Sequence, residues 1–91
     1  MITKPFKFSG NHLELNFETS AAGGLRVEIQ DEHGVPQAGY ALAECPEMIG
    51  DDVARTITWS AGGNVSKLAG KTVRLRIAMK DADLYSLRFH E

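Results

Sequence analysis

The sequence predicts an all-β protein in which two antiparallel sheets pack face to face. Apolar side chains recur at every second position in several separate stretches, which is the period of a strand with one buried face. Turn-forming glycine and aspartate residues separate these stretches. Six or seven short one-sided strands in 91 residues would leave an apolar face in water if they formed one open sheet. We therefore expect two sheets around a shared core.

Two clear strands are expected in the first third of the chain, at residues 12–18 and 25–29. Their inward positions are all large and apolar: Leu13, Leu15, Phe17, Leu25, Val27 and Ile29. The small residues 20–24 (Ser-Ala-Ala-Gly-Gly) are expected to form a turn between the two strands. A second, tighter turn is expected at residues 31–34, where Asp31 supplies a local hydrogen bond and Gly34 a positive φ.

The middle of the chain is the least periodic part. Residues 39–42 are interpreted as a short strand, and residues 43–52 as an irregular loop. Alternation returns at residues 55–60, where Ile57 and Trp59 are expected to face the core. The segment 61–63 (Ala-Gly-Gly) then breaks the pattern. At most one short helical turn is expected, near residues 65–69.

The last third predicts a hairpin. Residues 72–80 alternate as one long strand, with Met79 among the inward positions, and residues 81–83 (Asp-Ala-Asp) are expected to turn the chain. Residues 84–90 would return with Tyr85 on the core side, in phase with Leu87 and Phe89. Tyr85 and Trp59 are therefore expected to be core residues and not exposed platforms for a ligand.

Length, charge and cysteine content limit the class of protein. A chain of 91 residues predicts a single domain, residues 1–91. A net charge of -2 gives no reason to expect binding to nucleic acid or to a membrane surface. The one cysteine, Cys45, cannot form an internal disulfide, so localisation stays open. No transmembrane segment or secretory signal is recognised, and the signal of an exported parent protein would lie outside this chain.

Two segments near the C-terminus carry a family resemblance: residues 68–77, LAGKTVRLRI, and residues 80–89, KDADLYSLRF. Together with residues 24–31, 39–45, 50–51 and the strand ending in Trp59, they resemble the C-terminal accessory domain of glycoside-hydrolase-like proteins that contain a five-bladed β-propeller. The resemblance extends over roughly Leu13 to Phe89. It implies a jelly-roll-like β-sandwich that is excised from, or forms the C-terminal part of, a longer glycoside-hydrolase-like protein with a catalytic propeller. Its matching features are structural rather than reactive.

The resemblance implies a non-catalytic accessory domain whose partner is either a carbohydrate or the adjacent propeller. No catalytic residues are expected, because the acidic residues fall at turns or alternate outward beside arginines. No cofactor and no zinc site are expected, since the three histidines lack metal-ligand spacing. Structural calcium is kept as an alternative, with five loop or turn aspartates as its candidate ligands: Asp31, Asp51, Asp52, Asp81 and Asp83.

The outward strand positions offer the candidate carbohydrate-binding residues. Arginine and glutamate side chains can hydrogen-bond sugar hydroxyls or a carboxylate. The candidates share an outward position on a predicted strand: Arg26, Arg74, Arg76, Arg88 and Glu14. Glu28 is expected to be outward as well. The competing interpretation of these residues is cross-strand charge pairing on a solvated sheet face.

Two classes of function therefore remain open. A carbohydrate-binding module should show an open groove near Arg76. A structural or protein-interaction module, which braces the propeller or mediates oligomerisation, should show an exposed apolar patch or an uncovered strand edge. The sequence leaves the sugar, the parent protein's reaction and the oligomeric state undetermined.

Overall fold

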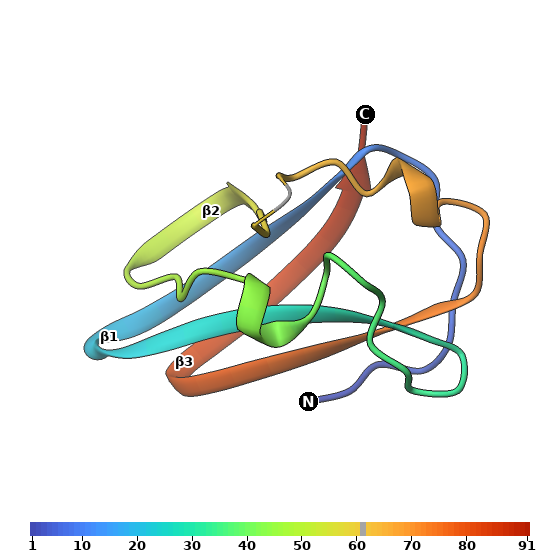
Figure 1. The fold of residues 1–91 in the computed structure, drawn as a ribbon. Helices are drawn as coiled ribbons and strands as arrows, with labels where there is room; N and C mark the ends of the chain where they lie inside the picture. The colour runs from blue at the N-terminus through green and yellow to red at the C-terminus, as the bar shows by residue number, and fades with distance from the viewer. Residues whose placement is uncertain (61) are drawn as a thin grey trace.

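The computed structural model describes residues 1–60 and 62–91, and it confirms the all-β class (Figure 1). Three strands form one antiparallel sheet in the order β2-β1-β3. The elements are β1 (His12–Asp31), the 3-10 turn η1 (Leu42–Glu44), β2 (Asp51–Thr56), the 3-10 turn η2 (Ser66–Leu68) and β3 (Val73–His90). The predicted six or seven short strands are thus replaced by two long strands, one short strand and isolated bridges.

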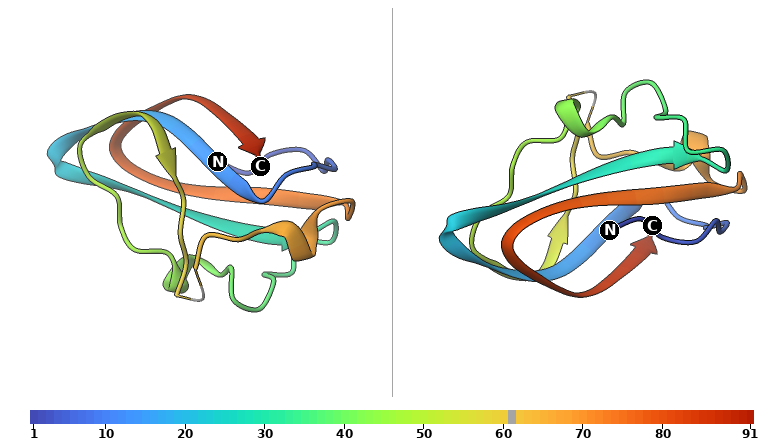
Figure 2. Two further views of the ribbon diagram at one scale, coloured as in Figure 1. Left: turned by 90° about the horizontal axis from the view of Figure 1, so that it is seen from above. Right: turned by 90° about the horizontal axis from the view of Figure 1, so that it is seen from below.

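Strands β1 and β3 form one long antiparallel ribbon that bends in its middle. The register runs from His12 opposite His90 to Thr19 opposite Ala82, and it resumes from Gly24 opposite Lys80 to Asp31 opposite Val73. Both halves of β3 therefore pair with β1, and the predicted hairpin between residues 72–80 and 84–90 is wrong. Figure 2 shows the ribbon folded back on itself.

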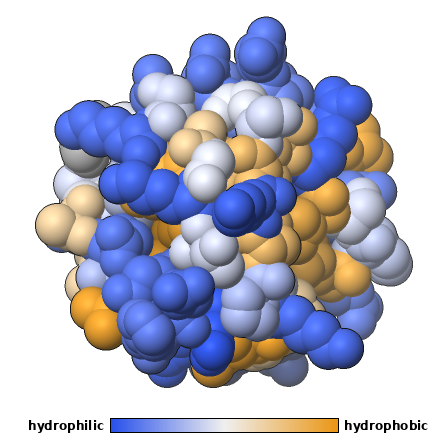
Figure 3. Space-filling model, turned by 90° about the vertical axis from the view of Figure 1, so that its right-hand side faces the viewer, coloured by the Kyte–Doolittle hydropathy of each residue, from blue (hydrophilic) through white to orange (hydrophobic). Residues whose placement is uncertain are grey.

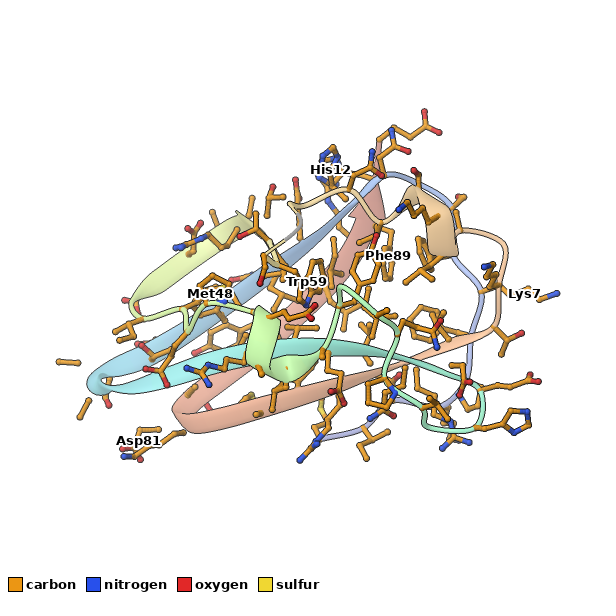
Figure 4. All side chains as sticks on the ribbon, in the orientation of Figure 1. Lys7, His12, Met48, Trp59, Asp81 and Phe89 are labelled. Atoms are coloured by element: carbon orange, nitrogen blue, oxygen red, sulfur yellow. The ribbon has the colours of Figure 1, made fainter. Side chains whose placement is uncertain are left out.

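The bend lies where small residues of β1 meet Asp81 of β3. Four residues of β1, 20–23, stand against this single residue, which has a φ of 46° and lies in the middle of β3, where the strand bends back (Figure 4). A Cβ at Gly23 would meet the carbonyl oxygens of Lys80 and Asp81, so a glycine is required for this close approach. The predicted turn at residues 20–24 is a bend inside one strand, because the partner strand bends with it.

Both halves of the ribbon contribute to a single core. The residues with the largest fully buried side chains include Leu13, Leu15, Phe17, Leu25, Val27, Ile29, Ile57, Val73, Leu75 and Ile77. Trp59 is also buried, and its Nε1 donates a 2.9 Å hydrogen bond to the Val27 carbonyl between the two halves (Figure 4). The inward positions predicted from alternation are confirmed for this set.

A loop covers one edge of the second half of β1. Met48 exchanges two backbone hydrogen bonds with Leu25, and Ile29 donates to the carbonyl of Tyr40. The expected strand at residues 39–42 does not form, because the turn η1 replaces its last residue. Glu28, expected outward, is only 4% exposed since this loop closes over it. Its Oε1 accepts from the backbone N–H of Leu42 at 3.1 Å.

The N-terminal segment, residues 1–11, precedes β1. It covers the edge of the first half of β3 that does not pair with β1. Phe6 exchanges backbone hydrogen bonds with Val73, and the N–H of Ile77 donates to the carbonyl of Met1. On the side of the molecule that carries Lys7 in Figure 4, hydrophobic surface lies between polar side chains (Figure 3). The segment thus pairs with residues 73–77 of β3, and its Phe8 ring stacks on Phe89 in the second half of β3, with 4.0 Å between the ring centroids.

Two further predictions need correction. The strand expected at residues 55–60 is shifted, because β2 spans Asp51–Thr56, although Ile57 and Trp59 are buried as expected. The helical turn expected near residues 65–69 is present as η2, but η1 is a second one, so "at most one" was wrong. Ala61, part of the predicted break at 61–63, lies outside the described residues. No helix in the described part of the chain is long and apolar enough to span a membrane.

Candidate functional site

A cleft of about 390 Å³ opens on the half of the sheet that contains all three strands. Its lining comes from β1, β2 and β3: Asn16, Phe17, Glu18, Asp51, Asp52, Val53 and Tyr85. The centre strand therefore supplies the floor, and the two edge strands supply the walls.

Two β-bulges on either side of Asn16 shape the cleft. On β3, Ser86 pairs with Asn16 but Leu84 pairs with Phe17, so Tyr85 is an extra residue. On β2, the register between Leu15 and Phe17 also shifts, which leaves an extra residue at positions 53–54. A bulge bends the strand and turns the extra side chain away from the regular alternation.

The bulge reverses the expected position of Tyr85. This side chain is 59% exposed, whereas the sequence predicted it to be in the core. Leu87 and Phe89 lie beyond the bulge and do pack against the core as expected. Val53 on the opposite wall is 82% exposed. The cleft therefore presents an aromatic and an aliphatic side chain to solvent on its two walls.

A hydrogen bond holds Tyr85 in place. Its hydroxyl donates to Glu18 Oε2 at 2.7 Å. This bond raises the pKa of the phenol above its ordinary value, because ionisation would remove the donated proton beside a carboxylate. Desolvation and the negative charges of Glu18, Asp83 and Asp51 raise the pKa further. Tyr85 consequently remains a neutral hydroxyl at physiological pH.

The ionisable groups that line the cleft, Tyr85 aside, are carboxylates: Glu18, Asp51 and Asp52. Arg55 approaches Asp52 at 3.9 Å and offsets part of this charge. Carboxylates and the Asn16 amide can accept hydrogen bonds from hydroxyl or amine groups, while they repel anionic ligands. The arrangement is suited to binding a polar ligand against an aromatic ring.

Reactive side chains elsewhere in the described residues are not arranged as a catalytic or metal centre. Within residues 1–60 and 62–91, no group of three or more histidine, cysteine, aspartate or glutamate side chains is placed to hold a metal ion, so the calcium alternative gains no support. Cys45 is buried, and burial raises the pKa of its thiol, which disfavours the thiolate that nucleophilic catalysis needs.

Two of the predicted carbohydrate-binding residues lie on the same half of the sheet as the cleft. Arg88 Nε donates to Glu14 Oε2 at 2.9 Å, and His90 Nε2 lies 2.9 Å from Glu14 Oε1. The hydrogen bond from Arg88 holds the pKa of Glu14 below its ordinary value. Glu14 and Arg88 stand opposite each other, two register positions from Asn16 and Ser86. They border the cleft but do not line it.

The other three predicted residues lie on the second half of the ribbon. Arg76 stands opposite Glu28, with 3.9 Å between Nη1 and Oε2, and Arg74 stands opposite Gln30. Arg26 lines a separate hollow of about 200 Å³ beside Met79, which is 40% exposed and not inward as predicted. The five predicted residues are therefore not gathered in one site, and their role in sugar binding stays a prediction.

Sequence reasoning missed most of the cleft. Asp51 and Asp52 were considered only as calcium ligands. Tyr85 was assigned to the core, because the alternation of apolar residues does not reveal that β3 contains an extra residue at this position.

Comparisons with protein-family models, with curated proteins and with solved structures find no match to this chain. The geometry of the cleft therefore carries the functional argument by itself.

Proposed function

We propose that this chain is a non-catalytic, carbohydrate-binding accessory domain of a glycoside-hydrolase-like protein, and that the cleft at Tyr85 is its binding site. The observation that carries the proposal is the exposed ring of Tyr85, fixed by its hydrogen bond to Glu18 beside a row of acceptors. Sugars combine apolar C–H faces with hydroxyl donors, so an aromatic ring next to carboxylates matches both of their surfaces.

The proposed architecture is a jelly-roll-like sandwich of two sheets. It is supported by the bent ribbon, because both of its halves contribute buried side chains to one core. One sheet would comprise β2, residues 12–19 of β1 and residues 82–90 of β3. The second would comprise the remaining halves, flanked by the N-terminal segment and the loop that reaches Met48.

The charge of the cleft narrows the class of ligand. Three carboxylates line it, so a uronate or sulfated glycan would bring like charges together. Neutral or amine-bearing oligosaccharides avoid this repulsion. A volume of about 390 Å³ lies near the lower end of the usual size of small-molecule sites, about 300–1,000 Å³. The ligand is therefore a short stretch of a glycan chain.

Calorimetric titration of neutral, amine-bearing and uronate oligosaccharides tests the proposal. We expect the wild type to bind one of the first two classes and Tyr85→Ala to weaken binding at least about tenfold, since losing a stacked aromatic face removes on the order of 1.4 kcal/mol. Arg76→Ala is the matched control on the other half of the ribbon and should bind like the wild type. Silence of the wild type toward all three classes would contradict the proposal.

The same variants separate the cleft from the arginines. If Arg76→Ala abolished binding and Tyr85→Ala left it intact, the binding site would be the face around Arg76 and not the cleft. A second candidate function, protein interaction, is favoured by the outer edge of β3 around Ser86, because β3 is the last strand of the sheet.

A further inference from the structure

We propose that a second copy of this chain pairs with the outer edge of β3, along residues 82–90, about a two-fold axis at Ser86. The three strands of each copy would then form one continuous antiparallel sheet. This pairing does not depend on the proposed ligand, and its test is separate from the binding test.

The outer edge of β3 is open along this half. β3 is the last strand in the order β2-β1-β3. In the part of the chain that the structure describes, the bridges and backbone hydrogen bonds from residues 1–10 to β3 reach only residues 73–77. At the far end of β3, Asn11 donates to the His90 carbonyl and the Phe8 ring stacks on Phe89, so the open stretch of the edge is centred on Ser86. An unpaired strand edge exposes backbone N–H and C=O groups that can pair with another strand.

The side chains along this edge are complementary to themselves. An antiparallel copy related by a two-fold axis at Ser86 would bring opposite charges and apolar side chains together. With the extra residue Tyr85 left unpaired in each copy, the pairs would be Leu84 with Leu87, Asp83 with Arg88, Ala82 with Phe89, and Asp81 with His90. Opposite charges directly across a strand pair stabilise it, and like charges destabilise it, which is why we assign a second copy to this edge.

The bulge at Tyr85 makes this register geometrically allowed. Residues paired across two strands must point to the same face of the sheet. Leu84 and Leu87 stand opposite the inward residues Phe17 and Leu15, so they share the core side. In a regular strand, two residues three positions apart would point to opposite faces. The extra residue Tyr85 removes this conflict.

The charged pair satisfies the same condition. Asp83 stands opposite Glu18, and Arg88 stands opposite Glu14, so both lie on the face that carries the cleft. Arg88 would then lie between Glu14 of its own chain, at 2.9 Å, and Asp83 of the second copy. Because Tyr85 adjoins the axis residue Ser86, the two clefts would lie side by side on one face.

Charge-reversal variants test the pairing by analytical ultracentrifugation over a concentration series. We expect the wild type to dimerise, and Asp83→Arg and Arg88→Asp each to weaken the dimer at least about tenfold, because each opposes like charges twice about the axis. An equimolar mixture of the two variants should restore dimers, since both charged contacts become attractive again. Glu32→Arg, which makes the same change of charge in the exposed turn after β1, should dimerise like the wild type.

Disulfide trapping tests the register. Ser86→Cys should form a covalent dimer under mild oxidation, because the axis places this residue opposite itself, and the buried Cys45 does not compete. Ala54→Cys on the exposed strand β2 is the control and should remain largely uncrosslinked. Circular dichroism checks that each variant is folded. A wild type that stays monomeric at all concentrations, or a mixture that fails to restore dimers of two folded variants, would overturn the proposal.

Discussion

The hydroxyl of Tyr85 and the carboxylate of Glu18 are joined by a 2.7 Å hydrogen bond that crosses from β3 to the centre strand β1. Tyr85 is the extra residue of a bulge, and Glu18 is an outward residue of β1 between that bulge and the bend at residues 20–23. A single bond therefore fixes the exposed ring to the centre strand, and it connects the fold to the proposed binding site.

The pKa of Tyr85 should depend on Glu18. Substitution Glu18→Gln removes the negative charge and the strongest acceptor, so we expect the raised pKa of the phenol to fall toward the ordinary value of tyrosine. Ultraviolet difference titration measures this change. The titration of Tyr85→Phe supplies the contribution of Tyr40, which is subtracted. A phenol pKa that Glu18→Gln leaves unchanged would show that this hydrogen bond is absent in solution.

Stability at acid pH should depend on Glu14. The pKa of this carboxyl is lower in the folded protein than in the unfolded chain, chiefly through the hydrogen bond from Arg88. Its contribution to stability is therefore present above the unfolded pKa and is lost as the pH falls through the folded pKa. We expect Glu14→Gln to flatten the decline of the unfolding free energy below about pH 4.5.

Urea unfolding at a series of pH values measures this decline, with Glu32→Gln in the exposed turn as the control. An unchanged pH profile in Glu14→Gln would contradict the prediction. The sign is fixed by linkage, because protonation of a carboxylate whose folded pKa is depressed favours the unfolded state.

Glu28 should matter more for stability than the exposed pair of Glu14 and Arg88. Its carboxylate is buried, accepts from the Leu42 backbone N–H, and accepts from Gln30 Nε2 at 2.8 Å. Glu28→Ala leaves these donors without a partner, so we expect a loss of about 1–3 kcal/mol in unfolding free energy. Arg88→Ala breaks a surface ion pair and should cost about 0–1 kcal/mol. Equal losses in urea unfolding would refute this ranking.

Gly23 should be intolerant of a side chain. A Cβ there would meet two backbone carbonyl oxygens at the bend, and backbone cannot move aside as a flexible side chain can. We expect Gly23→Ala to lower the melting temperature, because the ribbon must open for the methyl group to fit. Ala22→Ser, at the exposed neighbouring position, is the control for a small change at the bend. A Gly23→Ala variant as stable as the wild type would place the bend elsewhere.

Local alternation identified much of the core correctly. Residues such as Leu15, Val27 and Ile77 are buried as predicted, since a strand with period two exposes its apolar face to whatever layer covers it. The same reasoning failed for Glu28 and Tyr85. Glu28 is polar but covered by a loop from elsewhere in the chain, and Tyr85 is displaced by one extra residue in its strand.

The hairpin expected at residues 81–83 shows why strand pairing could not be predicted. Asp-Ala-Asp is a favourable turn sequence, and two alternating segments flank it. Pairing with β1 gives each half of β3 a partner strand of matching length. A hairpin within residues 72–90 would remove this long partner strand from β1. The choice between these two arrangements depends on residues more than forty positions away in the chain.

The amino-acid sequence by itself determined the all-β class and most inward-facing side chains, because both follow from the period of two and from local turn chemistry. Only the tertiary structure decided which strands pair, where the ribbon bends and which residues line the cleft. The reason is physical: pairing and bulges depend on the register between distant segments, and a shift of one residue moves a side chain from the core to the surface.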